Sequence, residues 1–144
     1  MASLKYWIWL TTRRGLGLQG TLRLLDAFGD PARVYFADPA EYRQFSQAAQ
    51  ASLLDKSLDR VEEILGICDS LGIRLLTLQD AQYPERLRNL DDPPLLLYLK
   101  GKLFSFDEEV AIGLVGAREA TPYGISMAGR LGLDLARGGA LLVS

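Results

Sequence analysis

The chain has 144 residues, enough for one ordinary domain or two small ones. Its apolar share of 49% and its charged share of 24% are typical of a globular protein and exclude a disordered tail. Sixteen basic and eighteen acidic side chains leave a net charge of −2. Overall charge therefore does not attract nucleic acid, and any such contact has to come from a local site.

Two residue types restrict the chemistry. The chain has no histidine, which excludes Ser-His-Asp and Cys-His catalysis and histidine-containing zinc sites. Cys68 is its single cysteine, so no disulfide can form within the chain, and we expect a reduced core thiol. The longest apolar run, residues 95–99, is too short to span a bilayer. We expect no metal and a cytoplasmic protein.

The first half of the chain has helical periodicity, and we predict a small helical domain over residues 1–71. Asp30-Pro31 and Asp38-Pro39 each have the form of a helix start, an N-cap followed by proline. A last helix is predicted from about Leu53 to Leu71, with Gly72 as its C-terminal cap. Its expected inner face consists of Leu54, Leu58, Val61, Leu65 and Cys68.

After Gly72 the pattern becomes that of an α/β domain, which we predict over residues 72–144. Strands are expected at 73–78, 95–99, 110–115 and 140–143, and a helix at 121–137. A strand, a helix and a further strand in this order predict a βαβ unit and a parallel sheet. Because such a sheet needs cover on both faces, we expect the chain to be part of a longer protein.

The turn after the third predicted strand is the strongest candidate site. Gly116 there would let a phosphate approach the backbone, and the next helix would offer N–H donors at its N-terminus. Arg118 adds a planar set of donors suited to phosphate. The structural alternative is that Gly116 only permits the turn and Arg118 pairs with a carboxylate. Tyr123 and Lys100 are further candidates near this crevice.

Standard nucleotide sites are absent from the sequence. Leu114 and Arg118 stand where a G-x-G-x-x-G motif needs glycine, and Gly101-Lys102 lacks the rest of a Walker A motif. We therefore expect no nucleotide cofactor. The turn from Gly15 to Gly17 is compatible with a helix-hairpin-helix that binds DNA phosphate through Arg13, Arg14 and Arg23. A plain turn in a helical bundle is the favoured interpretation.

The aromatic residues of the first half could stack on bases, but their helical spacing favours core packing for most of them. They are Tyr6, Trp7, Trp9, Phe28, Tyr35 and Phe36.

Five motifs, in this order and spacing, resemble the DNA-processing protein A (Smf) family. They are Tyr83-Pro84 with Leu87, Asp92-Pro93-Pro94 with Leu97–Gly101, Val110–Arg118, Thr121–Gly124, and Leu135-Ala136 with Gly138–Ser144. The resemblance covers about residue 73 to the last residue. It implies an extended Rossmann-like domain, and the helical first half fits the sterile-alpha-motif-like domain that the family often carries.

The resemblance also implies a function. Members of the family bind single-stranded DNA, protect it during natural transformation and help load the RecA recombinase, without nucleotide-dependent catalysis. The turn Gly116-Ala117-Arg118 matches the family's Gly-Ser-Arg-type signature, which contacts phosphates. Ala117 departs from that signature, so one hydroxyl contact is lost. The next family motif begins at Ser144, and with it we expect a basic pocket, a homodimer interface and a RecA contact surface to be absent.

Our prediction is a DNA-binding protein that is not an enzyme. One alternative is a Rossmann-like hydrolase of nucleoside monophosphates, for which Glu119 is the nearest carboxylate in sequence. Another is that residues 1–71 serve only as a protein-interaction module.

Overall fold

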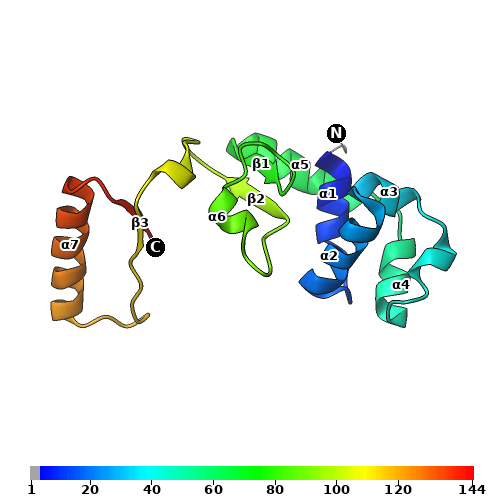
Figure 1. Cartoon of the computed structure of the whole chain (residues 1–144), viewed down its shortest axis with the longest axis horizontal. Coiled ribbons are helices and arrows are strands. Elements are labelled where there is room, and N and C mark those ends of the chain that lie inside the picture. The colour runs from blue at the N-terminus through cyan, green and yellow to red at the C-terminus, as the bar shows by residue number, and fades with distance from the viewer. Residues whose placement is uncertain (1–3) are drawn as a thin grey trace. The chain divides into compact units, whose positions relative to one another are not determined.

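The computed structural model describes residues 4–144 and divides into two compact units, residues 1–103 and residues 104–144 (Figure 1). The boundary predicted from the sequence, between residues 71 and 72, lies within the first unit. The first two strands belong to the same unit as the helical bundle because Leu75 and Leu96 pack against the bundle's core. The two-domain boundary at residue 71 stays a prediction.

The first unit begins with the predicted helical bundle, which is confirmed from Leu4 onward; residues 1–3 lie outside the described part. Trp9, Leu24 and Val61 are among the fully buried side chains at its centre. The helices are α1 (Leu4–Thr11), α2 (Gly17–Phe28), α3 (Pro31–Phe36), the 3₁₀ helix η1 (Pro39–Tyr42), α4 (Gln47–Leu54) and α5 (Asp59–Leu71).

The predicted helix boundaries at Asp30, Asp38 and Gly72 are confirmed. The Asp30 carboxylate accepts a 2.9 Å hydrogen bond from the Arg33 N–H, and Asp38 forms a capping box with Glu41 at the start of η1. Gly72 ends α5 in the left-handed conformation, with φ 63°, which glycine adopts without the penalty of a side chain.

The predicted helix from Leu53 to Leu71 is wrong at its start. Leu53 and Leu54 end α4, and α5 begins only at Asp59. The intervening residues are not helical because the Asp55 carboxylate accepts from the Ser57 N–H at 3.0 Å, a local bond that competes with helix formation. Leu54 is consequently 48% exposed and not on an inner face, whereas Val61 and Cys68 are buried as predicted.

The expected Rossmann-like parallel sheet is also corrected by the structure. Strands β1 (Arg74–Thr77) and β2 (Leu96–Leu99) pair with each other antiparallel and form a sheet of two strands within the first unit. Their connection contains the short helix α6 (Glu85–Arg88), which the sequence analysis missed. The Tyr83 hydroxyl donates a 2.6 Å hydrogen bond to the Pro94 carbonyl and thereby holds the two ends of this connection together.

The second unit contains the predicted βαβ arrangement. Strands β3 (Ala111–Gly113) and β4 (Leu141–Val143) pair parallel, and α7 (Pro122–Arg137) connects them, as Figure 1 shows. The 3₁₀ helix η2 (Phe106–Glu108) precedes β3. Gly132 is the buried residue of α7. A Cβ atom there would lie 3.5 Å from the side chains of Leu114 and Leu142, an ordinary van der Waals separation, so α7 packs on the sheet at this residue. This parallel pair positions the candidate site.

No helix of the described residues combines the length and apolar character needed to cross a membrane.

Candidate nucleic-acid interface

The candidate site is the connection between β3 and α7, residues 114–121. Gly116, Ala117 and Arg118 lie exposed in this connection. It leaves the carboxyl end of a strand in a parallel pair, which is the usual position for ligands in such sheets. The structure thus brings the three residues of the predicted turn together at the expected edge of the sheet.

Gly116 is not required by the fold. Its φ is not positive, so the backbone conformation is open to other residues, and a Cβ atom there would meet nothing within 4 Å. The structural alternative, in which this glycine only permits a turn, therefore finds no support in the backbone. Open space beside the main chain is what close approach of a phosphate needs.

Arg118 is exposed, and no ion pair or hydrogen bond joins its guanidinium to any other residue in the described part of the chain. The structure therefore does not support the alternative in which Arg118 pairs with Asp or Glu. An unpaired guanidinium keeps its donors available for an incoming phosphate or carboxylate.

The N-terminus of α7 offers fewer donors than the sequence suggested. Pro122 has no N–H, and the Gly124 N–H donates to the Thr121 hydroxyl at 3.1 Å. The Ile125 N–H donates to the Thr121 carbonyl, which leaves the Tyr123 N–H. Most unoccupied donors lie in the loop instead, because the amides of residues 115–120 have no acceptor within residues 4–144. The unoccupied N–H donors of the candidate site therefore lie in the loop more than at the helix N-terminus.

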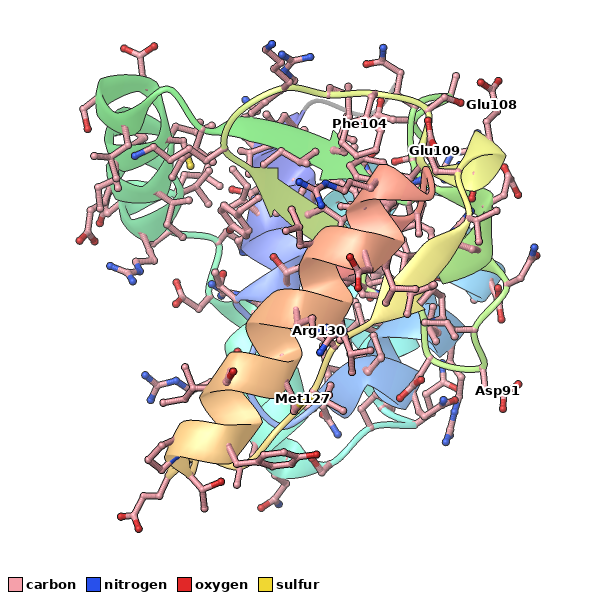
Figure 2. All side chains as sticks on the ribbon, turned by 90° about the vertical axis from the view of Figure 1, so that its left-hand side faces the viewer. Asp91, Phe104, Glu108, Glu109, Met127 and Arg130 are labelled. Atoms are coloured by element: carbon pink, nitrogen blue, oxygen red, sulfur yellow. The ribbon has the colours of Figure 1, made fainter. Side chains whose placement is uncertain are left out.

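Tyr123 lies in the first turn of α7 and is 74% exposed. An exposed aromatic ring is suited to stacking on a base. Arg130 is a further exposed cation on α7 that the sequence analysis did not single out. It follows Tyr123 by seven residues, two helical turns, so the two share a face; Figure 2 shows Arg130 and Met127 on this helix. That spacing is the signal that could have identified Arg130.

The remaining candidates belong to the first unit. Lys100 is exposed just after β2. Gly15 and Gly17 have positive φ, 78° and 61°, as expected for a tight turn.

Arg13 is not available to DNA. Its Nη1 donates hydrogen bonds to the carbonyls of Ser52 (2.8 Å) and Asp55 (2.9 Å), and its side chain is 8% exposed. Burial lowers the pKa of this guanidinium. Arg13 therefore serves the packing of the bundle, which agrees with a plain turn more than with a helix-hairpin-helix.

The aromatic side chains mostly pack inside, as expected. Trp7 and Trp9 are buried, whereas Phe36 is 71% exposed and its ring lies against Tyr35 and Tyr6. The residues described hold no group of three or more potential metal ligands.

Comparisons with known proteins match the segment that contains the candidate site. Residues 74–144 match the family model of DNA recombination-mediator protein A. The chain is also 29% identical over 101 residues to the DNA processing protein DprA of Bacillus subtilis, a match that covers 70% of this chain and 34% of the relative. The chain thus spans about a third of the length of the relative it matches. Residues 74–144, which include the β3–α7 loop, are thus similar to the DNA recombination-mediator protein A family.

Proposed function

We propose that the protein binds single-stranded DNA through the β3–α7 loop and acts as a binding protein, not as an enzyme. The observation that carries this proposal is an exposed loop whose amides and whose Arg118 guanidinium have no partner among the described residues. It lies within the segment that matches a recombination-mediator family.

The loop would hold the sugar–phosphate backbone in two ways. Gly116 leaves space beside the main chain, so a phosphate oxygen can accept hydrogen bonds from neighbouring amides. Arg118 would add a charge-assisted, bidentate contact. Tyr123 would stack on a base of the same strand, which favours an unpaired strand because its bases are accessible.

The wider role is likewise proposed, on the similarity of residues 74–144 to the recombination-mediator family. The protein would protect an incoming strand in the cytoplasm and help load the RecA recombinase on it during natural transformation. The whole protein would act as a homodimer, and neither a cofactor nor a metal is needed for a contact made by amides, a guanidinium and a ring. Lys100, exposed after β2, is proposed as a further phosphate contact.

Fluorescence anisotropy with a labelled single-stranded oligonucleotide tests the proposal. Arg118→Ala should weaken binding about tenfold, because a hydrogen bond to a charged group contributes about 1.5 kcal/mol or more. Arg137→Ala is the matched control: it removes the same charge at the opposite end of α7, about 20 Å along the helix.

We expect Arg137→Ala to bind within about twofold of the unmodified protein, since a distant exposed charge contributes little at ordinary ionic strength. Equal losses of affinity in the two variants would show that only the overall charge matters. An unchanged affinity in Arg118→Ala would show that the loop does not contact the DNA.

A further inference from the structure

The end of strand β2 in the first unit combines an exposed aromatic ring with exposed cations. Tyr98 is 51% exposed, and Lys100, Gly101 and Lys102 follow it on the surface. Side chains two residues apart in a strand point to the same face, so the Tyr98 ring and the Lys100 side chain lie next to each other. This pair of residues has the composition of a nucleic-acid contact.

The main chain at this point has N–H donors without acceptors. The amides of residues 100–102 donate no hydrogen bond within residues 4–144. Gly101 has φ 107°, a conformation that favours glycine, and a Cβ atom there would meet nothing within 4 Å. An anion can therefore approach these amides closely, as free N–H groups and open space beside them are what anion binding by a backbone needs.

The side chains around these amides are positive. No ion pair joins Arg74, Lys100 or Lys102 to a carboxylate in the part of the chain that the structure describes. Arg74 lies opposite Leu99 in the β1–β2 pair, which places its Cα atom about 6 Å from that of Lys100. Three unpaired cations at one end of a small sheet give a positive local field, although the net charge of the chain is −2.

Helix α5 holds one end of the Tyr98 side chain. Burial raises the pKa of Tyr98; Cys68 adds a smaller contribution and Arg60 opposes it, so the hydroxyl lies close to these two residues of α5. Arg60 itself pairs with Glu63 at 2.6 Å and is not a further phosphate ligand. A ring that is already held in place loses little conformational entropy when a base stacks on it.

We propose that the end of β2 is a second binding site for single-stranded DNA. Tyr98 stacks on a base there, and the amides of residues 100–102, with Arg74, Lys100 and Lys102, hold the flanking phosphates. This site rests on the single-strand binding proposed above and adds to it a contact within the first unit. An unpaired strand fits the site because its base faces are free, whereas those of a duplex are stacked on one another. An acidic peptide would use the cations alone.

Photocrosslinking of the full-length protein to a single strand that contains 5-iododeoxyuridine tests the site, since this base crosslinks to rings that stack on it. A strand of about 30 nucleotides is long enough for two sites. We expect mass spectrometry to find crosslinks at Tyr98 and at Tyr123 of the β3–α7 loop. Phe36, which is 71% exposed on α3, is the control ring and should not crosslink.

The crosslinks distinguish this site from the loop. Crosslinks at Tyr123 without Tyr98 would overturn the second site and leave the proposed function standing. Crosslinks at Tyr98 without Tyr123 would support the second site and count against the loop, and crosslinks at neither ring would contradict both.

Affinities of paired variants separate the ring from the charges. Tyr98→Leu should weaken binding of the same strand about fivefold or more, whereas Tyr98→Phe, which keeps the ring face, should stay within about twofold of the unmodified protein. Equal affinities of these two variants would overturn the stacking. Should Tyr98→Leu not fold, the crosslinks of the unmodified protein decide the question.

The salt dependence of the affinity tests the cations. Replacing Lys100 and Lys102 together by alanine should reduce the magnitude of the slope by about 1.4, because two phosphate contacts to a single strand are lost. Lys5→Ala is the control, since Lys5 lies on the Tyr6 ring of α1, and it should keep the slope. An unchanged slope in the double variant, or displacement of the strand by polyglutamate as readily as by oligothymidylate of equal charge, would overturn the DNA site.

Discussion

Gly116 is a glycine that the fold leaves unconstrained, since neither its φ nor a neighbouring atom forbids a side chain. Gly116→Ala should therefore leave the free energy of unfolding within about 0.5 kcal/mol. If a phosphate approaches the backbone here, the added methyl group should weaken single-strand binding several-fold. Gly113→Ala is the control, because Gly113 on β3 has equally open surroundings and lies before the loop. Parallel binding and unfolding measurements separate the two effects, and an unchanged affinity in Gly116→Ala would contradict close approach.

Lys56 makes the free energy of unfolding depend on pH. Its folded pKa of about 8, lowered mainly by burial, lies below the ordinary value near 10.4, so between these values the unfolded chain binds more protons. The free energy of unfolding should rise with pH in that window, on the order of 1 kcal/mol after allowance for partial exposure. Burial raises the pKa values of Tyr42, Tyr83 and Tyr98, which lowers stability above about pH 10.

Denaturant unfolding at several pH values between 7 and 10 measures this dependence. In Lys56→Met the titrating group is absent, so the rise should disappear while the rest of the core is kept. A rise of equal size in Lys56→Met would assign the effect to other groups.

Two glycines of the first unit, one within α5 and one in the turn between α1 and α2, have opposite requirements. Gly66 lies in α5 with nothing within 4 Å of a built Cβ, whereas at Gly15 φ is +78° and a Cβ would lie 3.0 Å from the Ala49 nitrogen. Gly66→Ala should stabilise the chain by about 0.5–1 kcal/mol through helix propensity. Gly15→Ala should destabilise it by about 1–3 kcal/mol. Thermal unfolding of the two variants checks this. Unfolding temperatures that shift in the same direction would contradict the positive φ of Gly15 in the α1–α2 turn.

The boundaries of elements were predictable where a local residue determines them. Four residues start or end a helix through their own side chain or backbone conformation: Asp30, Asp38, Thr121 and Gly72. The break between α4 and α5 combines the local bond from the Ser57 N–H to the Asp55 carboxylate with a distant one, in which the Asp55 carbonyl accepts from the Trp9 side chain, 46 residues away. The distant bond was not predictable from the local sequence. Tertiary contacts there outweigh the apolar periodicity that suggested a continuous helix.

The candidate site was predictable in part, for a similar reason. The order of strand, Gly116 turn and helix placed the loop correctly, because a βαβ unit fixes where a strand ends. The sequence could not show that Thr121 occupies one of the helix N–H groups, nor that Arg118 has no partner among the residues described. Both depend on side-chain geometry.

On the scale of the whole molecule, strand direction was the main error. Four short apolar segments were recognised as strands, but apolar pattern alone does not say which strand pairs with which. The β1–β2 connection folds back through Tyr83 and α6 and gives an antiparallel pair, while β3 and β4 form a parallel pair through α7. The chain covers 34% of the DprA relative, and its net charge of −2 means that the proposed DNA binding has to depend on a local site.

The salt dependence of single-strand affinity tests the local site most directly. Plotted as the logarithm of the association constant against that of the salt concentration, Arg118→Ala should have a slope smaller in magnitude by about 0.7 than that of the unmodified protein, since one phosphate contact to a single strand is lost. Arg137→Ala should keep the original slope. If Arg118→Ala retains both the original slope and the original affinity, the β3–α7 loop does not hold the phosphate backbone.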